Sequence, residues 1–191
     1  MLSSIVLAAG KSSRMGHLKQ LMPWRQGTII EQVIDNLINS AADEVIEVLG
    51  YRAEDIGKVI VNKSVKVVVN PDFEQGLSTS IIAGLNAVDS RAQAVMIALG
   101  DQPLIDSQLI DRLIEEFHNN NKGIVIPTYH GIRGHPVIFA IKYKEKLLEL
   151  KGDIGGRQII EDHAWDTLEV PVNCEGVCID VDTLNDYFNK Q

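Results

Sequence analysis

The chain has 191 residues, of which 45% are hydrophobic and 23% are charged, and these are the proportions of a globular protein, not of a disordered or fibrous one. Its 18 basic and 26 acidic residues leave a formal net charge of −8, which disfavours nonspecific binding to nucleic acid or to an anionic membrane. The sequence has no apolar run of about 18 residues and no basic leader with a cleavage site, so we expect one cytoplasmic domain.

Short apolar runs alternate with segments of helical periodicity along the first two thirds of the chain. The runs predict buried strands at residues 5–8, 45–49, 65–69, 94–99 and 123–126. A helix is predicted behind the capping box formed by Thr28 and Glu31, and another behind Asp106 as its N-cap. Strands that are apolar throughout favour a parallel sheet covered on both faces. The sequence therefore predicts a doubly wound, mostly parallel Rossmann-like α/β fold.

In the last third of the chain, glycines interrupt the alternation of apolar runs with segments of helical periodicity. We expect a last strand near residues 177–181, and we interpret residues 128–191 as a small C-terminal β/α lobe over the site, not as a second domain. In open parallel sheets, ligands bind beyond the carboxyl ends of the strands. The loops after residues 8, 69, 99 and 126 are therefore the predicted location of the chemistry.

The loop after the first predicted strand combines small residues, hydroxyls and bases, and its sequence is LAAGKSSRMGHLK, residues 7–19. Small side chains allow backbone N–H groups to approach phosphate oxygens, and cations neutralise the charge of a triphosphate. A Walker motif is excluded because Ile5 stands where a glycine is needed, five positions before Gly10. The loop also lacks the Gly-x-Gly-x-x-Gly pattern of dinucleotide sites. It predicts a phosphate cradle of another kind.

This loop resembles the signature L-A-A-G-x-S-x-R-M-G-x-x-K of the MobA/MocA-like nucleotidyltransferases, and its Ala-Ala-Gly and Ser-Ser variant is closer to the cytidylyltransferase branch than to the guanylyltransferase branch. Further blocks match the family in the same order and cover nearly the whole chain; they lie at residues 75–85, 100–103, 131–137, 152–157 and 179–183. Two details depart from the family pattern. Leu184-Asn185-Asp186 replaces the usual Pro-Glu-Asp run, and Gly156 stands where alanine is common.

The resemblance implies a single nucleotidyltransferase domain of the nucleotide-diphospho-sugar transferase type over residues 1–191, with a nucleotide-binding part at 1–127 and an acceptor-side lobe at 128–191. It implies transfer of CMP from CTP to the molybdenum cofactor, Mg²⁺ as cofactor, and a molybdenum hydroxylase as a possible client. Two alternatives stay open. One is guanylyl transfer or transfer to a sugar phosphate on the same fold, and the other is a carrier of the finished cofactor without turnover.

The reaction needs cations and positioning more than a base, because a phosphate monoester acceptor is already largely a dianion at neutral pH. Arg14 and Lys19 are the candidate catalytic cations, and Asp101 is the candidate catalytic carboxylate. The family blocks imply further nucleotide-binding residues, namely Leu7, Ala8, Ala9, Gly10, Gly76 and Ser80. They also imply acceptor-binding residues, namely Gly134, His135, Pro136, Asp153 and Arg157.

Three aspartates are the candidate metal ligands. Asp101 follows a predicted strand across Gly100, where a hard oxygen ligand suits Mg²⁺. Asp180 and Asp182 alternate with aliphatic residues, so in a strand both carboxylates would lie on one face and repel each other unless a cation lay between them. A turn or capping role for Asp101, and a solvated edge for the later pair, are the structural alternatives.

Other noticeable residues receive structural roles. Cys174 and Cys178 have no second Cys or His pair at ligand spacing, which disfavours a zinc site. Residues 78–80 place three hydroxyls at a predicted helix N-terminus, where at least one should act as N-cap and where a base edge or phosphate could bind. Trp24 is expected to be a packing residue.

Overall fold

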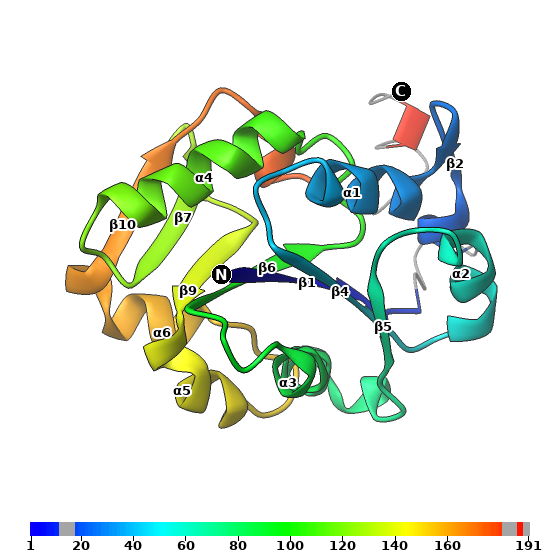
Figure 1. Cartoon of the computed structure of the whole chain (residues 1–191), viewed down its shortest axis with the longest axis horizontal. Coiled ribbons are helices and arrows are strands. Elements are labelled where there is room, and N and C mark those ends of the chain that lie inside the picture. The colour runs from blue at the N-terminus through cyan, green and yellow to red at the C-terminus, as the bar shows by residue number, and fades with distance from the viewer. Residues whose placement is uncertain (12–17, 181–186, 189–191) are drawn as a thin grey trace.

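A mixed, mostly parallel sheet lies at the centre of the computed structural model, which describes residues 1–11, 18–180 and 187–188 (Figure 1). Among these residues the strands follow the order β10-β7-β9-β6-β1-β4-β5, and β8 pairs with β7. The strands of this sheet are β1 (Leu2–Ala8), β4 (Glu44–Leu49), β5 (Lys66–Val69), β6 (Ala94–Leu99), β7 (Ile124–Tyr129), β8 (Ile132–Arg133), β9 (Val137–Ala140) and β10 (Thr167–Pro171). A separate hairpin consists of β2 (Pro23–Trp24) and β3 (Gly27–Thr28).

Strand β1 pairs in parallel with both β4 and β6, and β5 pairs in parallel with β4. Strand β9 is antiparallel to β6 and β7, between which it lies, and β10 is parallel to β7. The predicted fold, a mostly parallel α/β sheet, is confirmed. The proposed division at residue 127 falls inside β7, and the sheet continues across it, so that division remains a prediction about function.

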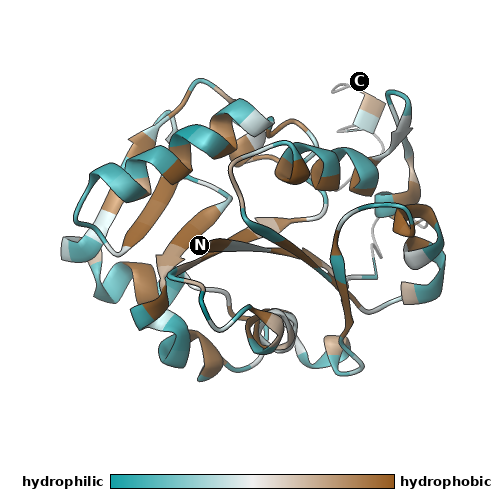
Figure 2. Ribbon diagram, viewed as in Figure 1, coloured by the Kyte–Doolittle hydropathy of each residue, from teal (hydrophilic) through white to brown (hydrophobic). Residues whose placement is uncertain are grey.

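Helices cover both faces of the sheet (Figure 1). The first face is packed by α1 (Ile29–Ile38), α2 (Ala53–Ile60) and α4 (Ser107–Asn119). The opposite face is packed by α3 (Leu77–Ala87), α5 (Lys144–Leu148) and α6 (Arg157–Asp162). Figure 2 shows hydrophobic colouring along the central strands and on the sheet-facing sides of the helices. Burial of these two apolar layers is the main stabilising term of such a fold.

Both predicted helix starts are confirmed. The Thr28 N–H donates to Glu31 Oε2 at 2.9 Å, and the Glu31 N–H donates to Thr28 Oγ1 at 3.4 Å, which completes the capping box of α1. The Asp106 carboxylate accepts the Leu109 N–H at 2.8 Å and caps α4. Each cap satisfies backbone donors that the first helical turn leaves without partners.

The expected strand at 65–69 is present but is not buried, and the expected last strand is absent at residues 177–180. The run at 65–69 forms an edge strand, and Val67 and Val69 are 46% and 58% exposed, because β5 has a neighbouring strand on only one side. Residues 177–180 contain no strand, since Glu175–Val177 form a 3₁₀ turn, and the last described strand is β10. Apolar periodicity identifies an extended segment but does not tell which segments find a partner in the sheet.

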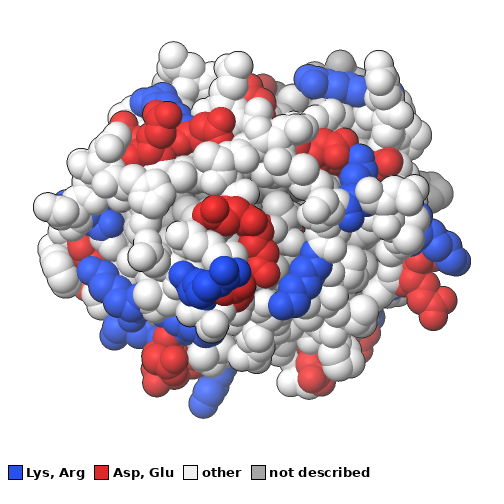
Figure 3. Space-filling view, viewed as in Figure 1, with Lys and Arg blue, Asp and Glu red and all other residues white. Residues whose placement is uncertain are grey.

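Charges of both signs are interspersed on the face shown in Figure 3, where Lys and Arg side chains lie beside Asp and Glu side chains. Surface pairs on the described residues include Arg52 with Asp55 and Arg91 with Asp89. No helix in the described part of the chain combines the length and the apolar character needed to span a membrane.

The fold contains one unusual polar group, the carboxyl of Glu47 in β4. This side chain is fully buried on the α1 face, and neither carboxyl oxygen has a hydrogen-bond partner among the described residues. Burial holds the pKa of Glu47 well above its ordinary value, so the folded protein binds this proton more tightly than the unfolded chain does. At pH values above the ordinary glutamate pKa, folding must therefore take up a proton.

We predict that Glu47→Met stabilises the protein by about 1–3 kcal/mol, because it removes a buried group without a partner. In the wild type, the contribution of Glu47 to stability is greatest below the ordinary glutamate pKa and decreases as pH rises toward the raised value; the variant should lose this part of the pH dependence. Urea unfolding between pH 5 and pH 8 measures both effects. Glu115→Met, at an exposed site in α4, is the control and should change neither. Parallel pH profiles for wild type and Glu47→Met would contradict the prediction.

Candidate functional site

The carboxyl ends of the central strands meet at one edge of the sheet. In register, Leu7 of β1 lies beside Leu99 of β6, and Ala8 of β1 lies beside Leu49 of β4. The loop after β1 and the turn after β6 therefore leave the sheet side by side. This is the edge where sheets of this type bind their ligands.

Lys19 and Asp101 form an ion pair at this edge. Lys19 begins the 3₁₀ turn Lys19–Leu21, and Asp101 follows β6 across Gly100. Their side chains are only 12% and 16% exposed, so solvent screens the pair less than it screens the surface pairs. The structure thus brings together a cation and a carboxylate that are 82 positions apart in the sequence. Arg14, the second predicted cation, lies outside the described residues.

His135 lies near the same carboxylate. Burial lowers the pKa of the His135 imidazole, and the negative charge of Asp101 raises it by a smaller amount. The ring is therefore neutral near pH 7. The backbone N–H of His135 donates to the Val177 carbonyl at 2.8 Å, which attaches the loop before β9 to the C-terminal segment.

Asp180 reaches this region from the C-terminal segment. Its Oδ1 accepts a hydrogen bond of 2.8 Å from Gln102 Nε2, the side chain next to Asp101. The predicted strand that would have placed Asp180 and Asp182 on one face is absent at Asp180, and Asp182 lies outside the described residues. The premise of alternation is therefore wrong for Asp180, which is positioned by contacts between loops.

The N-terminus of α3 forms another side of the candidate site. Gly76, its N-cap, has φ +114°, and a Cβ there would overlap the backbone of Gly152 and Asp153. The Ser78 N–H donates to the Gly152 carbonyl at 3.1 Å, and Asp153 Oδ1 accepts the Leu77 N–H at 3.3 Å. The expectation that a hydroxyl caps this helix is wrong, because Asp153 and the Gly152 carbonyl accept these N–H groups.

Ser80, a predicted nucleotide-binding residue, is buried. It is 4% exposed, and its Oγ accepts a hydrogen bond of 3.0 Å from Asn70 Nδ2. Gly10 is exposed and has open space around it, and Ala8 and Ala9 are buried at the end of β1. Of the predicted nucleotide-binding residues, Gly10 therefore lies in an exposed loop, whereas Ala8, Ala9 and Ser80 are buried.

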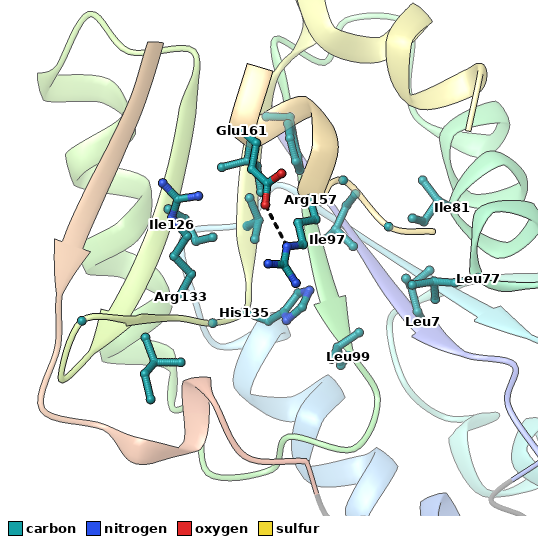
Figure 4. A pocket seen from close by; sticks show the side chains of 18 residues that line it. Leu7, Leu77, Ile81, Ile97, Leu99, Ile126, Arg133, His135, Arg157 and Glu161 are labelled. Atoms are coloured by element: carbon teal, nitrogen blue, oxygen red, sulfur yellow. Dashed lines mark hydrogen bonds and ion pairs between the residues drawn. The ribbon is translucent and has the colours of Figure 1, made fainter. Parts of the chain in front are cut away.

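A cavity of about 590 Å³ opens between the N-terminus of α3 and the loop before β9 (Figure 4). Its floor is apolar and includes Leu7, Ile81, Ile97 and Phe139. Polar groups lie around it, and those shown in Figure 4 are Arg133, His135, Arg157 and Glu161. Volumes of this size accommodate small-molecule ligands.

Two arginines at the cavity are held by carboxylates. Arg157 Nε donates to Glu161 Oε1 at 2.9 Å, one turn along α6 (Figure 4). Arg133 Nε donates to Glu169 Oε1 at 2.8 Å. Arg133 was absent from the predicted site, although it lies inside the matched block at 131–137. Pro136, which was predicted, follows His135 at the start of β9.

Residues 4–168 match the family described as the MobA-like NTP transferase domain. The chain belongs to this family. It is 30% identical over 190 residues to the molybdenum cofactor cytidylyltransferase of Escherichia coli, and the match covers 98% of this chain and 94% of that protein. It is 26% identical to the nicotine blue oxidoreductase of Paenarthrobacter nicotinovorans, covering 97% of this chain and 94% of that one.

Solved structures agree with this assignment. The crystal structure of Rv0371c from Mycobacterium tuberculosis superposes with a TM-score of 0.88 at 31% identity, covering 98% of this chain and 95% of that one. A structure of the same protein in complex with manganese has a TM-score of 0.84 at 29% identity, covering 98% and 96%. The predicted family and the predicted enzyme class, a nucleotidyltransferase, are confirmed.

Asp101 and Asp180 are the described carboxylates that could bind a divalent cation at this edge. Asp101 already faces a positive charge, the Lys19 ammonium, and Asp180 adds a second carboxylate beside the neighbouring Gln102. Carboxylate oxygens are the ligands that Mg²⁺ and Mn²⁺ prefer. The described residues alone contain no group of three His, Cys, Asp or Glu that could hold a metal ion. Two described carboxylates fit the expected cation, and a third would have to come from elsewhere.

Gly134 is predicted to be essential for the shape of this site. A Cβ at Gly134 would overlap the Val177 carbonyl, whereas Gly57, inside α2, has nothing within 4 Å. Gly134→Ala should therefore destabilise the protein by about 1–3 kcal/mol through overpacking. Gly57→Ala should stabilise it by about 0.5–1 kcal/mol, as expected in a helix. Urea unfolding measures both, and equal effects would show that the Gly134 contact does not form in solution.

Proposed function

We propose that the protein transfers CMP from CTP to the molybdenum cofactor and releases pyrophosphate. The observation that carries the proposal is the pairing of Lys19 with Asp101 at the carboxyl edge, next to a cavity large enough for a planar acceptor. The near full-length relationship to a molybdenum cofactor cytidylyltransferase supports the choice of nucleotide and acceptor. The relationship to an oxidoreductase shows that membership of the family does not by itself specify the reaction.

In this proposal, Arg14 and Lys19 neutralise the triphosphate. A bond forms between an acceptor phosphate oxygen and the α-phosphorus of CTP, and the bond to the β-phosphate breaks, so that pyrophosphate leaves with the electron pair. The acceptor phosphate needs no general base, because it is largely a dianion at neutral pH. Mg²⁺ bound by Asp101 with Asp180 or Asp182 would stabilise the charge that develops on the phosphate oxygens.

The acceptor is proposed to occupy the cavity. Its apolar floor suits a flat heterocycle, and Arg133 and Arg157 offer cations to an anionic group. A neutral His135 contributes a polar edge without adding a charge. The loop at Gly76 and the helix start behind it are proposed to face the cytosine. A molybdenum hydroxylase as recipient of the product remains a prediction.

Pyrophosphate release tests the proposal directly. With Mg²⁺ and the molybdenum cofactor, we expect turnover with CTP to exceed turnover with GTP, because a buried polar group left unpaired by the wrong base costs binding energy. Equal or greater turnover with GTP would place the protein in the guanylyl branch. Cofactor binding without pyrophosphate release with any nucleotide would indicate a carrier.

The role of the ion pair can be separated from its effect on stability. Lys19→Met should reduce turnover about 10²–10³-fold, since removal of one preorganised charge costs about 3–4 kcal/mol in the transition state. The double variant Lys19→Met/Asp101→Asn removes both charges and should recover thermal stability but not activity. Lys58→Met, which breaks the exposed pair of Lys58 with Asp55 in α2, is the control and should keep its activity. Near wild-type turnover in Lys19→Met would overturn the assignment.

A further inference from the structure

The Gln102 side chain is a buried amide that follows Asp101 of the candidate site. It is 3% exposed and lies one residue beyond Asp101, where the chain leaves β6. Its Nε2 donates to Asp180 Oδ1 at 2.8 Å and to the Val177 carbonyl at 3.4 Å. One amide group therefore contacts both the carboxylate and the backbone of the C-terminal segment.

The Val177 carbonyl joins this contact to the loop before β9. It accepts the His135 N–H at 2.8 Å in addition to the Gln102 amide. Gly134 packs directly against the same carbonyl. The segment that carries Asp180 is thus held between the loop after β6 and the loop before β9, although no strand is present at residues 177–180.

The other end of the Gln102 amide is left unsatisfied. Its Oε1 is buried and has no hydrogen-bond donor among the described residues. A buried acceptor without a donor destabilises the folded protein. An apolar side chain of similar size would avoid that cost, so stability alone does not account for an amide at this position.

A neutral amide and a charged side chain would affect the Asp180 carboxylate differently. A lysine or arginine at this position would hold Asp180 equally well but would neutralise it, and would then compete with a cation for its oxygens. A neutral N–H donor orients the carboxylate without adding a positive charge beside it. Donors that orient a ligating carboxylate in this way tune the affinity of metal sites.

We infer that Gln102 is a positioning residue that orients the Asp180 carboxylate toward the divalent cation accompanying the nucleotide. The inference rests on the proposed function in one respect, namely that Asp180 ligates the cation. Gln102 itself contacts neither the cation nor the substrates in this assignment. Its contribution is made through Asp180.

The test compares Gln102→Met, Asp180→Asn and the double variant in the full chain. Binding of Mn²⁺ in the presence of CTP, without an acceptor, is measured by electron paramagnetic resonance, so the readout does not need turnover. Gln102→Met should weaken Mn²⁺ binding about 10-fold. In the Asp180→Asn background it should change Mn²⁺ binding less than about twofold, since contacts acting through one group are not additive.

A matched control is available in α6. Gln158 Nε2 donates to Asp162 Oδ1 at 2.8 Å, the same type of contact at an exposed site, so Gln158→Met should leave Mn²⁺ binding unchanged. Thermal unfolding of each variant establishes that it is folded. Gln102→Leu, which fills the buried volume differently, is measured in parallel and should give the same Mn²⁺ result as Gln102→Met.

Several outcomes would overturn the inference. These are unchanged Mn²⁺ binding in the folded Gln102 variants, full additivity with Asp180→Asn, and unchanged Mn²⁺ binding in Asp180→Asn itself. If the Gln102 and Asp180 variants shift Mn²⁺ binding as expected but wild type releases no pyrophosphate with the molybdenum cofactor, the proposed function fails and the positioning role stands. Where turnover is measurable, Gln102→Met should raise the metal concentration needed for half-maximal rate more than it lowers kcat.

Discussion

The parallel pairing of β1 with β4 and β6 is the constraint on which the site depends. Because these strands run in the same direction and in register, the loop after β1 and the turn after β6 leave the sheet at one edge. Parallel strands need crossover connections, and the helices of these connections cover the two faces. Polar loops are thereby confined to the ends of the strands. Lys19 and Asp101 meet for this reason, and not because of any closeness in the sequence.

An acidic protein that handles a triphosphate must concentrate its positive charge locally. The net charge is −8, and many of the described surface cations are paired with nearby carboxylates. Lys19 is different because its partner Asp101 is also largely buried and lies at the carboxyl edge. In the absence of nucleotide, each group satisfies the other. In the proposed reaction, a phosphate group would bind Lys19 and the metal would bind Asp101. Both charges are already desolvated before these ligands bind.

The acceptor side depends on close backbone contacts more than on charges. Gly134 allows the loop before β9 to approach Val177, and Gly76 allows the start of α3 to approach Gly152. Leu77, which follows Gly76, and Gly134 both line the cavity, whose floor is apolar. Strand β9 contributes to this arrangement, because its insertion between β6 and β7 carries His135 back toward Asp101.

The sequence by itself determined the elements whose signals are local. The capping box at Thr28 and Glu31 and the cap at Asp106 each specify their own helix start, since the groups that satisfy them lie within a few residues. The apolar run of β1 likewise predicted a buried strand, but not its partners. The ordered family blocks likewise indicated Lys19, Asp101 and His135 as site residues. Only the tertiary structure decided which elements become neighbours. It placed β5 at an exposed edge, inserted β9 between β6 and β7, and replaced an expected strand at Asp180 with a contact to Gln102. Pairing between distant segments depends on the packing of the whole sheet, and no local pattern encodes it.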